Sequence, residues 1–350
     1  MLLSPKDTFR PDSAGRIKLR WESFAYLPPE TMEALYTSKE PLEVPLNECD
    51  IIGHDGLLWL LSISRWRKAT GTGPTYIQLP RDPKAVSLIS DLNFPIRLID
   101  SGAQIVNQSV LWASNYGGEA QSGAPRRRPR PLSPRYIQLI NSSNWSNVFD
   151  AVDTYFVKDV SELLHQSPHD QLISEEALPF RKAIGELIIN VARHGGSSEG
   201  GGIGYVCYRP WARRYPLLRF CCNDLGPGFA TTLARHSDLR PASETEAVFQ
   251  ALLYRHSRPE EGVLGLYRAL PFIHSLRGRL HIRSVDASVT LDLSEASASA
   301  KFEAGYEHPT QEWVRSISKT RTAGKVRGCH IALDLHLPQT PAERRMDESH

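Results

Sequence analysis

Polar residues at helical spacing occur in the second half of the chain, at Glu186, Asn190 and His194. Residues four apart lie on one face of a helix, so these side chains would form a polar line, with the apolar residues between them facing a core. The amide oxygen of Asn190 suits a hard cation such as Mg²⁺. A carboxylate at Glu186, one turn away, has the chemistry to orient or deprotonate a water molecule. The alternative is an amphipathic helix whose polar stripe faces solvent.

A second cluster, Asn-Asp-Leu-Gly-Pro-Gly-Phe at 223–229, directly follows an apolar run at 217–222 that predicts a strand. Asp224 at the strand end is placed to accept a hydrogen bond from an exocyclic amine. Gly226 and Gly228 permit a tight turn and the close approach of the backbone to a ligand. An ordinary strand-to-helix turn with a capping aspartate would use the same residue types.

A third cluster places Gly262 and Gly265 just before a helix that we expect to begin near Leu266. The amides at a helix N-terminus form a ready site for an anion, and glycines leave those amides unblocked. Two glycines at this spacing are a weak signal by themselves. The order of the three clusters along the chain carries more information than any one of them.

In that order, the three clusters resemble the ATP-binding domain of the GHKL ATPase family, which includes type II topoisomerases, mismatch-repair ATPases, sensor histidine kinases and anti-sigma-factor serine kinases. The resemblance covers about residues 145–338 and implies a two-layer α/β sandwich that binds ATP and Mg²⁺. It makes Asn190 the Mg²⁺ ligand, Glu186 the catalytic base and Asp224 the residue that binds adenine. The ATP-binding set that it implies is Asn190, Asp224, Gly226, Gly228, Gly262, Gly265 and Leu266.

Two positions depart from the family pattern. Leu264 stands where many members have a glycine, which would stiffen the loop beside the phosphates. The last strand begins Gly328-Cys329, where many members have Gly-Thr and use the threonine to hold the adenine. These departures bear on affinity and hydrolysis rate rather than on the fold. The segment 231–261, between the second and third clusters, matches the ATP lid of the family.

Within the family, the anti-sigma type fits the chain best. A sensor histidine kinase needs a phosphoacceptor histidine on a long helix, but His165 is followed by Gln-Ser-Pro. Topoisomerase and mismatch-repair members carry a transducer domain after the ATPase, and few residues follow Pro338. We therefore expect a signalling protein that hydrolyses ATP or transfers its phosphate to a serine or threonine of a protein partner, and homodimers occur in this family. The alternative is a non-catalytic module in which ATP changes a protein-binding surface.

The rest of the chain divides by composition. Strand and helix patterns alternate in residues 1–100, which predicts a smaller α/β domain. It loosely resembles the STAS-type domains that partner anti-sigma kinases, and this implies a regulatory role. Proline, glycine and arginine dominate residues 101–135, as in an interdomain linker. The ATP-binding domain is expected over 136–338 and a flexible tail over 339–350.

The chain has 350 residues, with 41 Lys+Arg and 39 Asp+Glu, and hence a net charge of +2. This balance provides no general attraction to nucleic acid. The arginine-rich run 126–135 leaves a local phosphate contact open, although no aromatic residue interleaves with its arginines to stack on bases. No apolar stretch reaches the roughly 18 residues that a membrane span needs. Five cysteines without a Cys-x-x-Cys spacing favour a cytoplasmic location.

Overall fold

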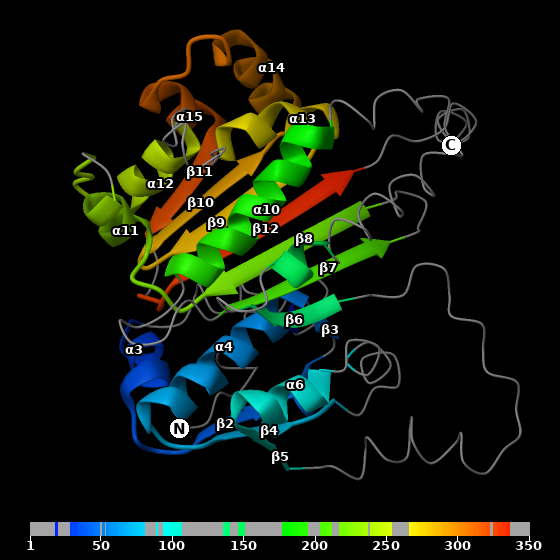
Figure 1. Cartoon of the computed structure of the whole chain (residues 1–350), viewed down its shortest axis with the longest axis vertical. Helices are drawn as coiled ribbons and strands as arrows, with labels where there is room; N and C mark the ends of the chain where they lie inside the picture. The colour runs from blue at the N-terminus through cyan, green and yellow to red at the C-terminus, as the bar shows by residue number, and fades with distance from the viewer. Residues whose placement is uncertain are drawn as a thin grey trace, which may run out of the picture. The chain divides into compact units, whose positions relative to one another are not determined.

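The structure is a computed structural model with mixed α/β architecture (Figure 1). It divides into two units, the first comprising Met1–Leu139, Tyr205–Cys207 and Ala323–Arg327, and the second Ile140–Gly204, Tyr208–Thr322 and Gly328–His350. The residues that the structure describes are 18–19, 29–49, 51–52, 54–80, 89, 94–106, 136–140, 146–150, 177–194, 204–211, 217–236, 239–253, 266–322 and 325–336.

The first unit contains a parallel three-stranded sheet in the order β2-β4-β5. Parallel neighbours need a crossover connection, and helices α4 (His54–Thr70) and α6 (Phe94–Ser101) lie in the two intervals between these strands. The elements in chain order are β1 (Lys18–Leu19), α3 (Pro29–Thr37), β2 (Leu42–Pro45), η1 (Leu46–Glu48), β3 (Ile51–Ile52), α4 (His54–Thr70), β4 (Thr75–Gln78), α6 (Phe94–Ser101) and β5 (Ala103–Ile105). β1 pairs with β3 in a separate two-stranded parallel sheet.

Strand β5 changes the boundary that the sequence predicted for the linker. The linker was expected to begin at residue 101, but Ala103–Ile105 forms the third strand of the sheet, and the Val106 N–H donates to the Ile77 carbonyl oxygen at 3.1 Å. Strand β5 has only three residues, of which Ala103 and Ile105 are buried. An alternation of buried and exposed residues this short cannot be recognised in the sequence. The remainder of the expected linker, 107–135, lies outside the described residues.

One end of the first unit is organised around Arg67, which is buried near the C-terminus of α4. Its guanidinium donates to three backbone carbonyl oxygens: Leu35 at 2.9 Å, Glu40 at 2.5 Å and Gly73 at 2.9 Å. These acceptors belong to α3, to the connection leading into β2 and to the turn before β4. Burial lowers the pKa of Arg67 from its usual value. The side chain therefore joins three segments of backbone that are distant in sequence.

The larger sheet has seven strands in the order β11-β10-β9-β12-β8-β7-β6. Strand β12, the last in the chain, lies between β8 and β9 and is antiparallel to both. The predicted hairpin is confirmed, because β9 and β10 pair antiparallel. The strands are β6 (Tyr136–Ile140), β7 (Gly204–Trp211), β8 (Leu217–Asp224), β9 (Arg279–Ser284), β10 (Ala287–Asp292), β11 (Ser318–Thr322) and β12 (Cys329–His336).

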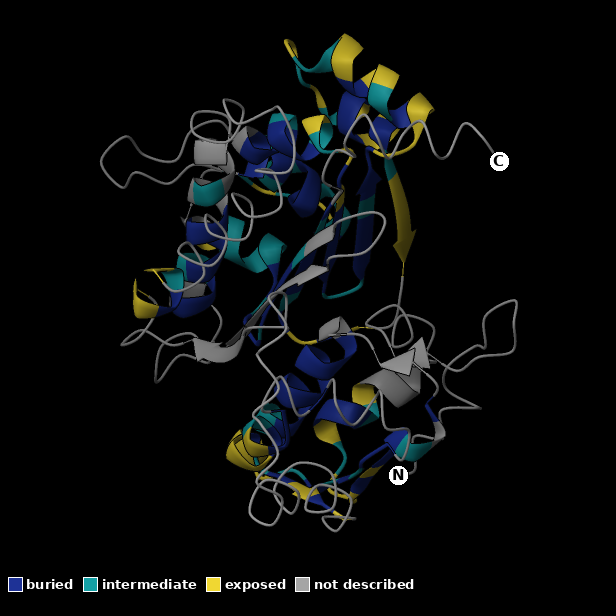
Figure 2. Cartoon of the chain, turned by 90° about the vertical axis from the view of Figure 1, so that its right-hand side faces the viewer, coloured by how far each residue is buried: buried dark blue, intermediate teal, exposed yellow. Residues whose placement is uncertain are grey.

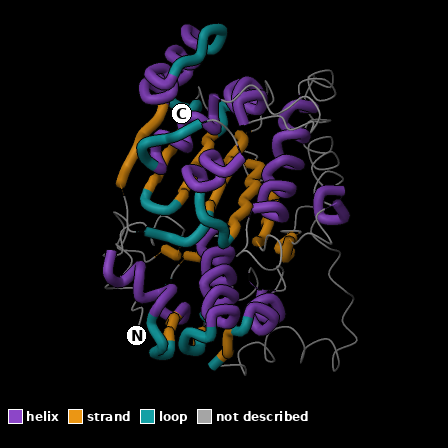
Figure 3. The backbone as a smooth tube through the Cα atoms, turned by 60° about the vertical axis from the view of Figure 1, so that its left-hand side comes forward, coloured by secondary structure: helices purple, strands orange, loops and turns teal. Residues whose placement is uncertain are grey.

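Three of the helices of the second unit cover one face of this sheet: α10, α12 and α13 (Figure 1). Two further helices, α14 and α15, form a pair beyond one end of the sheet (Figure 1, Figure 3). The helices in chain order are α10 (Ala177–His194), α11 (Phe229–His236), α12 (Glu244–Leu253), η3 (Leu266–Ala269), α13 (Leu270–Ser275), α14 (Ala296–Gly305) and α15 (Gln311–Ile317). Strand β11 follows α15 and is largely exposed (Figure 2).

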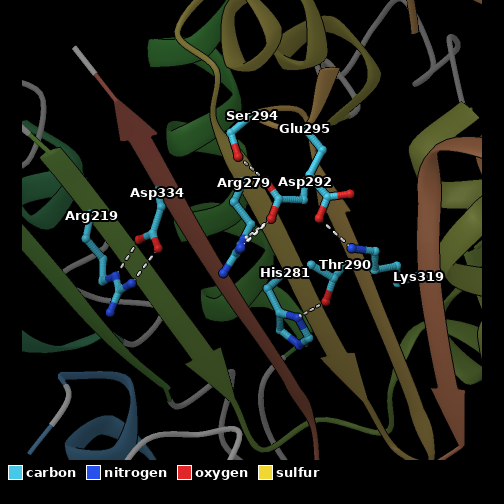
Figure 4. Close-up of polar contacts among 9 residues, drawn as sticks. All are labelled: Arg219, Arg279, His281, Thr290, Asp292, Ser294, Glu295, Lys319 and Asp334. Carbon is cyan, nitrogen blue, oxygen red and sulfur yellow. Dashed lines mark hydrogen bonds and ion pairs between the residues drawn. The ribbon is translucent and has the colours of Figure 1, made fainter. Parts of the chain in front are cut away.

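The two faces of the sheet differ because side chains alternate along each strand. One row of opposite residues on four neighbouring strands is apolar and buried: Phe220, Leu333, Leu280 and Leu291. The adjacent row, one residue along each strand, is charged: Arg219, Asp334, Arg279 and Asp292. Figure 4 shows the polar contacts of this region, in which Arg219 pairs with Asp334, Arg279 with Asp292, His281 with Thr290 and Lys319 with Glu295. Opposite charges on adjacent strands fix the register of the sheet.

The pair α14–α15 provides a first test of these packing assignments. Thr310 caps α15, its hydroxyl accepting a hydrogen bond from the Trp313 N–H at 3.1 Å. We expect Thr310→Ala to lower the free energy of unfolding by about 1 kcal/mol, because the first turn of the helix loses a partner. Thr310→Ser keeps an oxygen in place and should cost less than half as much. Urea denaturation of the three proteins measures this, and equal losses for both variants would contradict the cap.

Candidate functional site

Helix α10 presents the apolar face that the sequence predicted. Four side chains at helical spacing are buried: Ile184, Leu187, Ile188 and Val191. Asn190 is half-buried, at the side of this face, and α10 packs on β8 and on η3. Glu186 lies one turn earlier on the same helix, and its side chain is outside the described part of the structure. Asn190 is thus held on a helix that contacts both other parts of the predicted site.

Asp224 is the last residue of β8, as predicted from the end of the apolar run. Its Oδ1 accepts hydrogen bonds from the Gly226 N–H at 2.8 Å and from the Cys329 N–H at 3.1 Å. Both amides reach the same oxygen, and the described residues donate no hydrogen bond to Oδ2. Burial is the main cause that raises the pKa of the Asp224 carboxyl to about 6; the charge of Glu244 contributes to this rise, and the two backbone hydrogen bonds oppose it. A hydrogen-bond donor on a ligand would stabilise the charged form of this carboxyl, which burial disfavours.

Two glycines in the left-handed region lie in the turns beside Asp224, Gly228 after β8 and Gly328 before β12. Gly228 has φ of 90°, and a Cβ on it would lie 2.5 Å from the Val285 side chain. Gly328 has φ of 77°, and a Cβ there would overlap the carbonyl oxygen of Asp224. Both positions therefore require glycine. Gly226, predicted to serve the same purpose as Gly228, contributes its N–H to Asp224 instead.

The third predicted cluster is described only from Leu266 onward. Leu266 is buried and begins η3, which packs on α10, α12 and α13. Gly262 and Gly265 lie outside the described residues. The structure thus brings together α10, which carries Asn190, with β8, which ends in Asp224, and with η3, which begins at Leu266.

The segment 231–261, interpreted from the sequence as a lid, contains packed structure instead. Helix α11 begins at Phe229, and α12 follows from Glu244 to Leu253. Four residues of α12 form part of the core: Ala247, Val248, Phe249 and Leu252. A helix anchored on β9, β10 and η3 is part of the framework rather than a mobile cover. Residues 237–238 and 254–261 of this segment lie outside the described residues.

Three residues at the site were not among the predicted ligands. Glu244 and Ser284 both approach the turn that follows Asp224, and Cys329 binds Asp224 through its backbone. Cys329 could be recognised as a departure from the Gly-Thr pattern, but the role of its N–H could not. Glu244 was visible only as the first residue of a predicted helix, and no local pattern indicates its partners. Burial raises the pKa of Cys329, as does the charge of Asp224.

Within the described residues, no three His, Cys, Asp or Glu side chains converge in the manner of a metal site. Mg²⁺ commonly takes one or two protein ligands and fills its shell with phosphate oxygens and water. The half-buried Asn190 amide fits that mode, since it supplies a single oxygen ligand. No described helix is long and apolar enough to cross a membrane.

Comparison with models of known families, with characterised proteins and with solved structures found no match. The functional argument therefore rests on the residues themselves. Its strongest element is the surroundings of Asp224, where a strand end, two obligatory glycines and a single available carboxylate oxygen meet.

Proposed function

We propose that the second unit binds ATP together with Mg²⁺ and acts as a GHKL-type ATPase or protein serine/threonine kinase. The observation that carries this proposal is the Asp224 carboxyl, whose Oδ1 is held by two backbone amides while Oδ2 is left for a ligand amine. The exocyclic amine of adenine is a donor of the required kind. Gly228 and Gly328 support the proposal in a different way: their lack of a side chain lets the turns on either side of Asp224 pack closely, Gly228 against Val285 and Gly328 against Asp224 itself.

The remaining roles follow from the position of α10. Asn190 would hold Mg²⁺, which when bound neutralises the charge of the phosphates. Glu186, one turn away, would accept a proton from water or from the hydroxyl of a protein substrate. The amides at the start of η3, beginning with Leu266, would face the phosphates together with Gly262 and Gly265. In the same proposal, the first unit has a regulatory role like that of STAS-type domains.

A non-catalytic, ATP-gated module is the second candidate, and the Gly328–Cys329 turn favours it. At Cys329 a backbone N–H reaches Asp224 and no hydroxyl is available beside the base. A looser hold on the nucleotide would allow binding to change a protein-binding surface without turnover. The two candidate functions use the same nucleotide-binding residues and differ only in phosphate release.

Calorimetric titration of the full chain with ATP, with and without Mg²⁺, tests the proposal. We expect wild-type binding to strengthen with Mg²⁺, and Asn190→Ala to remove that dependence because the ion loses its protein ligand. Glu186→Ala should bind ATP normally and release phosphate at least about 100-fold more slowly, which is the usual size of a general-base effect. Normal release by Glu186→Ala would reject the assigned base. ATP binding without phosphate release by the wild type would establish the non-catalytic module.

A further inference from the structure

Glu244 is a buried glutamate whose carboxylate does not serve its own helix. It is the first residue of α12 and is 8% exposed. The start of α12 is capped by its neighbours, since the Glu246 N–H donates to the Ser243 hydroxyl at 3.1 Å and the Ala242 N–H donates to the Glu246 carboxylate at 2.8 Å. This is a reciprocal arrangement of the capping-box kind. The Glu244 carboxylate is therefore available to other elements.

The Glu244 carboxylate binds the N-terminus of α11, a different helix. Its Oε1 accepts from the Phe229 N–H at 2.6 Å, and its Oε2 accepts from the Ala230 N–H at 3.1 Å. These are the first two amides of α11, directly after the Asp224–Gly228 turn. A charge at a helix N-terminus is favourable because it faces the positive end of the helix dipole. The carboxylate also lies against Gly228, where a Cβ would be 2.8 Å from Oε1.

Ser284, the last residue of β9, extends this contact from the two helices to the sheet. Its hydroxyl donates to Glu244 Oε1 at 2.5 Å and accepts from the Phe229 N–H at 3.3 Å. Ser284 stands opposite Cys329 in the antiparallel pairing of β9 with β12, and the Cys329 N–H donates to Asp224 Oδ1. A continuous set of contacts thus runs from Glu244 through Ser284 and Cys329 to Asp224.

We infer that Glu244 is a positioning residue for nucleotide binding, fixing the turn after Asp224 and, through Ser284, the turn before β12, so that Asp224 Oδ2 is held toward the base. The inference rests on the proposed function. Glu244 touches no substrate in this arrangement. It acts on the two backbone turns on either side of Asp224, the one after β8 and the one before β12.

A purely structural role for Glu244 makes a different prediction. A structural cap would change stability and leave the affinity for nucleotide and its pH dependence unaltered. A positioning role also changes the protonation of Asp224. The titratable groups that face Asp224 are Glu244 from α12, Cys222 from β8 and Cys329 from β12. ATP affinity should fall at low pH as Asp224 becomes protonated, and we call this fall the acid limb of ATP binding. Because the charge of Glu244 raises the pKa of Asp224, removing that charge should move the acid limb to lower pH.

The test compares Glu244→Gln with Glu246→Gln in the full chain, by calorimetric titration with ATP and Mg²⁺ between pH 5 and 8.5. Glutamine keeps an oxygen for Phe229 and Ser284 but loses the charge and the acceptor for Ala230. We expect Glu244→Gln to bind ATP at least tenfold more weakly at pH 7.5, with its acid limb moved to lower pH. Glu246→Gln disturbs the cap of α12 and the contact of Glu246 with Gln250 on the same helix. It should keep its ATP affinity within twofold, with the same pH dependence as the wild type.

Wild-type affinity and an unmoved acid limb in Glu244→Gln would overturn the inference, as would an equal loss of affinity in Glu246→Gln. If Glu244→Gln does not fold, Ser284→Ala replaces it, because it leaves both Glu244 contacts with α11 in place and removes the hydroxyl that joins Glu244 to β9. Ser284→Ala should bind ATP at least threefold more weakly, and unchanged affinity would overturn the inference. Failure of the wild-type chain to bind ATP would overturn the proposed function as well, so the two failures are distinguishable.

Discussion

Replacing Asp224 by asparagine is expected to abolish ATP binding and, at neutral pH, to make the protein more stable. The loss of binding follows from the hydrogen bonds of Asp224, because both the Gly226 and Cys329 amides require an acceptor at Oδ1. The amide oxygen of asparagine would take that position, which leaves its NH₂ group facing the ligand. A donor would then meet the exocyclic amine of adenine, another donor, and affinity should fall by at least about 100-fold.

The gain in stability follows from the raised pKa. The Asp224 carboxyl has a pKa of about 6 in the folded chain, above the usual value of 3.8, so folding favours its neutral form. That contribution to stability is complete below pH 4 and is lost as the pH rises through 6. At pH 7.5 the folded protein therefore holds a buried charge that asparagine removes. We expect Asp224→Asn to raise the free energy of unfolding by about 1–3 kcal/mol at pH 7.5 and by little at pH 4.

Thermal melting at the two pH values, together with calorimetric titration at pH 7.5, checks both parts. Asp286→Asn, in the turn between β9 and β10, is the control, and it should change neither quantity. ATP binding by Asp224→Asn at wild-type affinity would remove Asp224 from the adenine site. A lower free energy of unfolding for Asp224→Asn at pH 7.5 would mean that the charged carboxylate stabilises the folded protein, which contradicts the prediction. The expected combination, a more stable but inactive variant, is typical of a residue retained for binding.

The sequence predicted the elements that have strong local patterns. The apolar spacing of α10, the two hydrophobic strands β9 and β10, and the position of Asp224 at the end of β8 were all recognisable, because each depends on a few neighbouring residues. The pair α14–α15 was not predicted. Its α14 is rich in alanine and serine with only Ala298 and Phe302 buried, so no apolar stripe marks it as a helix. It is stabilised by aromatic contacts such as that of Phe302 with Trp313, which only the fold brings together.

The parts of the candidate site that depend on distant partners could not be predicted either. Ser284 lies 40 residues from Glu244, and Cys329 lies 105 residues from Asp224. Nothing in the local sequence of Glu244 distinguishes it from the solvent-facing glutamates that commonly begin helices. The location of β12 between β8 and β9 decides which turn reaches Asp224, and strand order is a property of the whole sheet. Individual site residues could therefore be predicted from the sequence, but their contacts could not.

The first unit contains the residue whose loss should cost the most stability. Basic residues near the end of α4 predict a helix C-terminus, because they face the negative end of the helix dipole. Arg67 is instead 1% exposed, and its guanidinium binds carbonyl oxygens of Leu35, Glu40 and Gly73. Methionine has a similar length but no donor, so Arg67→Met would leave three carbonyl groups without this partner.

We expect Arg67→Met to lower the free energy of unfolding of the first unit by about 3–5 kcal/mol, since each buried carbonyl left without a donor costs about 1–3 kcal/mol and relaxation recovers part of the sum. Arg65→Met, two residues earlier and with a single contact at 3.3 Å to the Asp100 carbonyl, is the matched control and should cost less than about 1 kcal/mol. Urea denaturation gives the magnitude, and hydrogen exchange in residues 35–41 and 71–75 locates it. Equal losses for the two variants, or unchanged exchange in both segments, would contradict the role of Arg67, because its three hydrogen bonds converge on these segments alone.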